Sequence, residues 1–338
     1  MTKKAKNIEI FIFGLIFNFS FLTFNSFSQD FHFSQYESSP QYLNPSMTGM
    51  FDGDYRVITQ FRSQWTAIVS KPFTNSALSF DMPMKNNIKA GAFILNNRAG
   101  AGNYNALTFV LSGAYDLSIK NSPHHIAGGL QAGIIHKSVD INKLYFESQY
   151  SNSNGGGFNT SLPSNETIAG QSILLPEINV GLLYYFSKAD SRINPFLGGA
   201  AFHLTEPKET FYSADNKLPR RYVVHGGAKI NISTKLQMTL HFLGMQQTND
   251  REIVTSITGT YYLKGPEAFL LYGLNYRNKD AAIVHLGLKY GKLIYRISYD
   301  YNTSTLNAIS NGRGGVELSI VYMMKQKVPD PVAPCPRL

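Results

Sequence analysis

Hydrophobic and polar residues alternate along much of this chain, most regularly in residues 293–324. In the first half of this stretch the odd-numbered residues are apolar or aromatic, and the even-numbered residues include Arg296 and Asp300. In the second half the even-numbered residues are apolar, and Glu317 lies on the opposite face. Because successive side chains of a β-strand point to opposite faces, each half is predicted to be a strand with one apolar and one polar face.

The same alternation recurs in earlier segments of the chain. The strands that we predict, roughly ten residues long, lie at 55–65, 77–82, 89–95, 107–119, 126–137, 177–187, 193–205, 221–232, 235–245, 252–263, 267–276, 281–290, 293–301 and 316–324. The third of them is shorter and less regular than its neighbours. No helical periodicity interrupts the series, which excludes an α/β fold and indicates about fourteen strands.

The connections between these segments alternate between short and long. The short ones are 83–88, 121–123, 188–192, 233–234, 265–266 and 291–292. The others, which are mostly longer, are 66–75, 96–102, 139–176, 206–220, 246–251, 277–280 and 302–312. Outer-membrane barrels have tight periplasmic turns and longer outer loops, whereas a soluble sandwich gives no reason for this segregation. We therefore predict an all-β protein, a transmembrane antiparallel β-barrel whose even strand number places both termini in the periplasm.

The segments outside the predicted barrel differ in character. Residues 1–28 have a basic start, an apolar run and a small-x-small cleavage site, which predicts a secretory signal peptide and favours it over a membrane anchor. Residues 29–54 lack periodicity and are an ordered leader, a plug or a flexible arm. The barrel is predicted at 55–324, and 325–338 is a proline-rich periplasmic tail. The long loop 139–176 either folds over the barrel mouth or is a disordered outer loop.

Composition agrees with strands that are apolar on one face. Charged residues make up only 16% of the chain and aromatic residues 13%, with 28 glycines. The formal net charge of +9 is dispersed, and no basic run indicates nucleic-acid binding, so solvated loops together with a basic lumen or periplasmic face explain it. The single cysteine, Cys335, excludes an internal disulfide framework and a cysteine-rich zinc site.

Candidate chemistry is sparse. We find no nucleotide-binding glycine loop and no nucleophile elbow, so no catalytic, cofactor or metal residue is predicted, and the protein is not expected to be an enzyme. His225, His241 and His285 fall on polar strand faces, where imidazoles bonded to lumen water are the expectation.

Six charged residues point inward by strand parity: Arg56, Arg62, Asp81, Arg296, Asp300 and Glu317. They lie on the first two and the last two predicted strands, which must adjoin if the barrel closes. Charges on neighbouring strands that face a wet lumen pair with one another. A stabilising ion network or an ion-selective constriction would each use them. Trp65 ends the first strand on the lipid face, where interface aromatics lie.

Several short motifs resemble the PorP/SprF family. The N-terminal ones are Ser34-Gln35-Tyr36, Asn44-Pro45-Ser46-Met47-Thr48-Gly49, Tyr55-Arg56, Arg62-Ser63-Gln64-Trp65 and Ser79-Phe80-Asp81. The later ones are Tyr276-Arg277, Asp280-Ala281, Tyr299-Asp300, Glu317 and the ending Pro334-Cys335-Pro336-Arg337-Leu338, where Leu338 departs from an expected Phe. The resemblance runs from about Gln29 to the C-terminus.

This resemblance implies an outer-membrane barrel of the type IX secretion system in a Gram-negative bacterium. Such a protein assists the secretion or surface anchoring of particular cargo, often large adhesins, including those of gliding motility. The implied partners are outer-membrane lipid, periplasmic secretion or motility components and the C-terminal domain of a cargo protein, with no nucleic acid. The alternative is a FadL-like channel for hydrophobic solutes, because Asn44-Pro45-Ser46 resembles the plug of those barrels too.

Overall fold

The computed structural model describes residues 30–66, 68–69, 71–100, 102–118, 122–152, 156–166, 171–188, 190–211, 216–263 and 268–325. The predicted signal peptide at 1–28 and residues 326–338 of the predicted tail lie outside the described residues. The chain divides into residues 1–30 and 31–338, and the fold below is that of the second unit.

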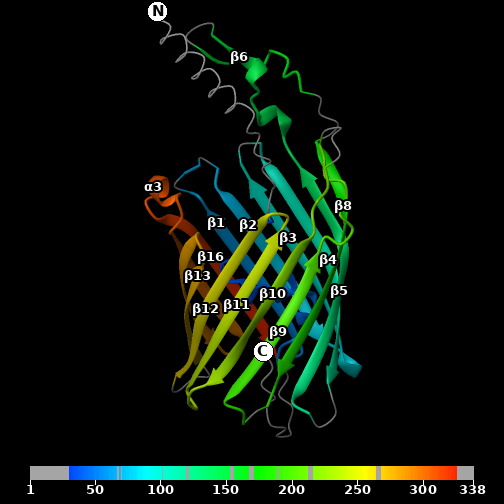
Figure 1. The fold of residues 1–338 in the computed structure, drawn as a ribbon, viewed down its shortest axis with the longest axis vertical. Coiled ribbons are helices and arrows are strands. Elements are labelled where there is room, and N and C mark those ends of the chain that lie inside the picture. The colour runs from blue at the N-terminus through cyan, green and yellow to red at the C-terminus, as the bar shows by residue number, and fades with distance from the viewer. Residues whose placement is uncertain are drawn as a thin grey trace, which may run out of the picture. The chain divides into compact units, whose positions relative to one another are not determined.

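Fourteen antiparallel strands close into one barrel (Figure 1). They are β1 (Tyr55–Gln64), β2 (Phe73–Pro83), β3 (Ile88–Ala99), β4 (Tyr104–Ser118), β5 (His124–Ser138), β8 (Ser172–Phe186), β9 (Ile193–Phe202), β10 (Arg221–Asn231), β11 (Leu236–Gln247), β12 (Asp250–Leu263), β13 (Ala268–Arg277), β14 (Ala281–Tyr290), β15 (Leu293–Asn302) and β16 (Arg313–Met324). Each strand pairs with its neighbours in sequence, and β16 returns to β1. The predicted fold class is confirmed.

Burial along the strands is inverted relative to a soluble protein. Outward residues are large and apolar, and Leu130 and Leu182 are 64% and 65% exposed. Inward residues are polar and buried, such as Gln60 and Ser298, each 2% exposed. This arrangement is stable only where the outer face contacts lipid, so the alternation in the sequence encodes a transmembrane barrel.

The seam between the first and last strands has a continuous register. Tyr55 lies opposite Met324, Arg62 opposite Glu317 and Gln64 opposite Gly315. The prediction that the last strand lies against the first is therefore confirmed, and the pairing brings two charged positions side by side.

Several predicted strand ends were wrong, and two of them show why. The third strand, expected at 89–95, extends over Ile88–Ala99 because the backbone ladder continues beyond the point where the apolar pattern stops. Asn97 donates to Asn75 at 2.5 Å, and Asn96 donates to Asn105 at 2.9 Å. The connection expected at 246–251 is only residues 248–249, since polar residues at both strand ends join the ladder.

Several short elements lie outside the barrel wall. They are η1 (Tyr36–Ser38), α2 (Pro40–Leu43), η2 (Pro45–Met47), η3 (Lys85–Asn87), η4 (Ile141–Lys143), η5 (Glu147–Gln149), β6 (Tyr150–Ser151), β7 (Gly157–Phe158) and α3 (Asn307–Ser310). The described parts of the 139–176 loop contain η4, η5 and the two-stranded β6–β7 sheet. Among the described residues, no helix has the length and apolar character needed to cross a membrane.

Candidate functional site

Residues 31–54, here called the inner segment, lie within the barrel. Near the loop end, His32 Nδ1 lies 2.8 Å from a Glu252 oxygen at the start of β12. Near the turn end, the Asp54 N–H donates to the Met324 carbonyl at 2.7 Å. Between these points the segment contacts inward residues all around the wall, so it fills much of the lumen.

The two termini, which were predicted to be periplasmic, lie outside the described residues, but the ends of the described part of this unit can be placed. β1 starts and β16 ends at the turn end, as an even strand number requires. The inner segment, however, doubles back inside the barrel, and His32 contacts residues near the loop end. The described ends of this unit, residues 31 and 325, therefore lie toward opposite ends of the barrel.

The inner segment is built from three single turns rather than from one long helix. Pro40 and Pro45 start the second and third turns, where a missing N–H costs no hydrogen bond. Between them Asn44 is extended, and its side-chain oxygen accepts from the N–H and the hydroxyl of Ser46 at 3.0 and 2.6 Å. Such short turns leave many backbone groups without internal partners, and the barrel wall has to supply them.

The carboxylate of Glu317 on β16 supplies two of these partners. Its oxygens accept from the backbone N–H groups of Ser34 and Gln35 at 2.7 and 2.9 Å. The side-chain amide of Gln60 on β1 donates to the same carboxylate at 2.5 Å and to the Gln35 carbonyl at 3.1 Å. Glu317 is only 1% exposed, so these hydrogen bonds replace water.

Two arginines balance the buried carboxylates at this point. Arg62 donates to Asp300 Oδ2 at 2.9 Å and lies 3.9 Å from a Glu317 oxygen. Arg277, on β13, lies 3.6 Å from the same Asp300 oxygen and donates to the Ser34 hydroxyl at 2.9 Å. Each of the four charged side chains is at most 3% exposed. Unpaired, each would carry a desolvation penalty of several kcal/mol, so the group holds the inner segment only as a complete set.

A second ion pair holds the inner segment near the turn end. Arg56 donates through Nε and Nη2 to the two oxygens of Asp81, at 3.0 and 2.6 Å. Asp81 also accepts from the Gly49 N–H at 2.7 Å. Gly49 has a φ of +66°, and a Cβ atom there would lie 2.8 Å from Lys89 Cβ. Glycine is therefore required at this position by both conformation and space.

Asn44 contacts the opposite side of the barrel. Its Nδ2 donates to the Leu182 carbonyl on β8 at 2.9 Å and lies 3.0 Å from His225 Nε2 on β10. The amide is completely buried, so it needs these partners. His225, expected to bond lumen water, is instead part of this contact.

Inward glycines make room for this contact. A Cβ atom on Gly129 would lie 2.3 Å from the Ser46 nitrogen, and one on Gly181 would lie 2.0 Å from Asn44 Oδ1. A Cβ atom on Gly198 would meet Asn44 Nδ2 at 2.8 Å. The inner segment therefore packs directly on the backbone of β5, β8 and β9.

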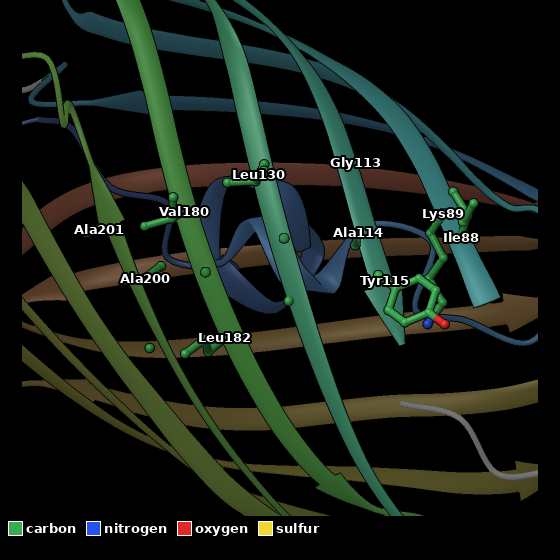
Figure 2. Close-up of a pocket in the computed structure, with 14 residues that line it drawn as sticks. Ile88, Lys89, Gly113, Ala114, Tyr115, Leu130, Val180, Leu182, Ala200 and Ala201 are labelled. Atoms are coloured by element: carbon green, nitrogen blue, oxygen red, sulfur yellow. The ribbon is translucent and has the colours of Figure 1, made fainter. Parts of the chain in front are cut away.

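The outer face of the same wall is also poor in side chains. A groove of about 810 Å³ crosses β3, β4, β5, β8 and β9, and Leu130 and Leu182 border it (Figure 2). Gly128 and Gly199 face this groove, and Cβ atoms there would approach nothing closer than 3.7 Å. Figure 2 shows the short turns of the inner segment behind these strands. Over this area only backbone separates the inner segment from the lipid-facing side.

The structure brings most of the predicted motif residues onto the inner segment or against it. Arg62, Asp300 and Glu317 lie together at Ser34 and Gln35. The other predicted positions divide into three further places: Gly49 with Arg56 and Asp81, Asn44 with Pro45 at the glycine wall, and Arg296 at Ser38.

Gln64 and Trp65 stand apart from these contacts. Gln64 is the last residue of β1, and Trp65 follows it with a φ of +62°. The Trp65 ring packs edge-on against the ring of Phe73, the first residue of β2, with 4.6 Å between the ring centres. Both residues therefore lie where β1 ends, at the loop end of the barrel, away from the inner segment.

Sequence reasoning missed several contributors to the site. Gln60 is inward by strand parity, and the rule that selected Arg62 would have found it. Arg277 belongs to the Tyr276-Arg277 motif, but it falls in a predicted connection, and only the longer β13 of the structure places it inward. Gly129 and Gly181 gave no such signal, since their importance depends on the inner segment, which has no periodicity that would predict where it packs.

The geometry of the interior favours holding a peptide segment. The buried side chains neutralise and cap backbone groups, and the charged groups are already engaged with one another. Among the described residues, no group of three or more His, Cys, Asp or Glu side chains is placed to hold a metal ion.

Comparison with protein families shows which family has this sequence pattern. The sequence profile of the type IX secretion system membrane protein PorP/SprF matches residues 25–322, which include the inner segment and nearly the whole barrel. The chain belongs to the PorP/SprF family. This PorP/SprF protein is thus a membrane barrel of a secretion system, and the barrel type is that of the outer membrane. Family membership also implies contact with membrane lipid and with components of that system. Comparison with curated proteins finds no match.

Solved structures resemble this PorP/SprF protein in fold. The toluene transporter TbuX of Ralstonia pickettii has a TM-score of 0.50 and 10% identity, covering 85% of this chain and 93% of that chain. A FadL homologue of Pseudomonas aeruginosa has a TM-score of 0.48 and 10% identity, covering 85% and 94%. At this identity the likeness to TbuX concerns the fold alone.

Proposed function

We propose that this PorP/SprF barrel is a non-enzymatic accessory of type IX secretion that assists the export or surface anchoring of particular cargo proteins. Large adhesins, including those used in gliding motility, are the expected cargo class. The observation that carries the proposal is the family match over residues 25–322. The inner segment supports it, because buried ion pairs fix this segment inside the barrel.

The proposal includes an orientation. The turn end faces the periplasm, since outer-membrane barrels carry their short connections there. The end of β16 and the tail that follows it then meet periplasmic secretion or motility components. The longer loops face the outside, where a secreted cargo protein would present its C-terminal domain.

Co-purification tests the proposal. The tagged barrel is solubilised from outer membranes after mild cross-linking, with an unrelated barrel of the same membrane as control. We expect one or a few large surface proteins to co-purify through their C-terminal domains, and none with the control. Absence of any surface protein, together with impaired uptake of a hydrophobic solute by the deletion strain, would instead support the FadL-like alternative.

A further inference from the structure

The inner segment covers the inner wall unevenly. It packs closely on β1 to β5, β8 and β9, where the inward residues are buried. On the turn-side half of β10 to β14 the inward residues are only half-buried: Lys229, Gln237, Thr239, Thr258, Thr260, Tyr262, Phe269, Leu271 and Lys289. Strand alternation fixes these positions on the inner face, next to buried His225, His241 and His285. This part of the lumen is therefore accessible surface, here called the open wall.

We propose that the open wall binds an acidic polypeptide segment through Lys229 and Lys289. These residues lie on β10 and β14, with three strands between them in the barrel order. Within the described residues neither ammonium group has an ion-pair partner. Lys289 makes a cation–π contact, in which its Nζ lies 5.1 Å from the centre of the Phe269 ring. The charges of the two lysines repel each other inside the same lumen. An anion between them would relieve that repulsion and gain two charge-assisted hydrogen bonds.

Within the described residues, the turn-side half of strands β10 to β14 carries no acidic side chain. On strands β10 to β14 the only acidic residues are Asp250 and Glu252, both at the loop end of β12. The nearest carboxylate of the inner segment, Glu37, lies 3.6 Å from His241 and accepts from Ser256 at 3.4 Å. The two lysines thus contrast with Arg62 and Arg56, whose carboxylate partners are built into the barrel.

The open wall offers an extended chain several kinds of contact. The two lysines lie on strands separated by β11, β12 and β13, so a chain that follows the wall can contact both. Between them lie hydroxyl groups of Thr239 and Thr258, which are direct partners in the β11–β12 ladder. Leu271 and Phe269 add an apolar side. Alternating charged, polar and apolar contacts suit the side chains of an acidic polypeptide.

Two exposed basic residues lie in the turns next to the open wall. Lys235 and Lys292 occupy the turns after β10 and β14. They would attract an acidic chain at long range, and Lys229 and Lys289 would bind it inside. The residues that follow β16 complement the open wall poorly, because 326–338 carry Lys327 and Arg337 against a single Asp330.

Binding to the purified full-length protein in phosphatidylcholine nanodiscs tests this inference. The probe is a fluorescein-labelled ten-residue peptide of alternating glutamate and glycine, and its control replaces glutamate with glutamine. We expect at least tenfold tighter binding of the acidic peptide. Lys229→Gln/Lys289→Gln should weaken it at least tenfold, whereas the matched rim pair Lys235→Gln/Lys292→Gln should change it less than threefold. Unchanged heat-modifiable migration in gels shows that each variant is folded.

Three results would overturn the inference. The acidic and amide peptides would bind alike, the two lysine pairs would have equal effects, or inorganic phosphate at matched ionic strength would displace the peptide at millimolar concentration. The last result would indicate a small-anion site. The measurement uses the barrel alone, so it is independent of the proposed role in secretion.

Discussion

At the level of single residues, the tightest steric constraint lies between Ser46 of the inner segment and Gly129 of β5. A Cβ atom on Gly129 would lie 2.3 Å from the Ser46 nitrogen, which is a backbone atom and has no freedom to rotate away. The next residue, Gly128, faces outward, and a Cβ atom there would meet only Leu182 Cδ2 at 3.8 Å. Two adjacent glycines of one strand therefore differ only in the face they present.

This pair makes a matched prediction. Gly129→Ala should lower the free energy of unfolding by about 1–3 kcal/mol, because a methyl group is forced into a filled contact. Gly128→Ala should change it by less than about 0.5 kcal/mol. Urea unfolding in detergent, followed by circular dichroism, measures both. Equal effects of the two substitutions would show that Ser46 does not pack on Gly129.

The Glu317 carboxylate makes a second prediction at this scale. Glu317→Gln keeps the shape but removes a charge that two backbone N–H groups and Arg62 require. We expect a loss of about 3 kcal/mol in unfolding free energy, the lower end for breaking a buried pair because Asp300 still neutralises Arg62. Proteolysis of the folded barrel should also cut the inner segment faster.

The control for this prediction is an exposed pair. Asp52 lies 2.7 Å from Lys325, and both side chains are about half exposed. Asp52→Asn should cost less than about 1 kcal/mol, since water screens such pairs. If Glu317→Gln were as mild as Asp52→Asn, the inner segment would not depend on the carboxylate.

Strand parity predicts which charged residues face inward but not what they bind. Arg62, Asp300 and Glu317 follow from counting in twos along β1, β15 and β16. Their partners Ser34 and Gln35 belong to a segment without periodicity, and its path through the barrel is fixed by contacts that are distant in sequence. The inward role of Gly129 is hidden for the same reason.

At the level of secondary structure, alternation predicts every barrel strand because lipid on one side and polar groups on the other select the side chains at each position. The strand ends are less predictable. Above the lipid the outer face of β3 turns polar at Asn96, and the pattern stops while the ladder continues. Likewise β11 and β12 are joined by only residues 248–249, although the sequence around them is polar enough to resemble a longer loop.

Cross-linking tests the register of the seam. Thr59 lies directly opposite Ile320 in the β1–β16 ladder. In a Cys335→Ser background, Thr59→Cys/Ile320→Cys should form a disulfide on mild oxidation and shift the mobility in unheated gels, since directly paired residues have the Cα separation that a disulfide needs.

The offset pair Thr59→Cys/Leu318→Cys provides the comparison. Its positions are diagonal in the ladder, about 7–8 Å apart, which is too far for an unstrained disulfide. Efficient cross-linking of the diagonal pair with none of the direct pair would mean a different seam register.

At the level of the whole molecule, the sequence predicts a barrel and its closure but not a lumen that is filled on one side and open on the other. That asymmetry arises because the inner segment contacts β1 to β5, β8, β9, β15, β16 and the loop-side half of β10 to β13, and the inward residues on the turn-side half of β10 to β14 stay only half-buried. It gives the barrel two distinct interior surfaces, one engaged and one accessible.

The proposed orientation is testable with the native cysteine. Cys335 follows β16, which ends at the turn end, and it is the only cysteine in the chain. A membrane-impermeant maleimide should leave it unlabelled in intact cells and label it after the outer membrane is permeabilised. Ser161→Cys, at an exposed position in the 139–176 loop, should be labelled in intact cells of a Cys335→Ser strain. The reverse labelling pattern would show that the barrel has the opposite orientation in the membrane.

We propose above that this PorP/SprF barrel serves the display of particular cargo proteins. The most direct test of this proposal is quantitative proteomics of the cell surface in a strain lacking the barrel, compared with the parent and with a strain complemented by the wild-type gene. We expect one or a few large surface proteins to disappear and to return on complementation, while uptake of hydrophobic solutes is unchanged. An unaltered surface proteome with reduced uptake of such a solute would contradict it.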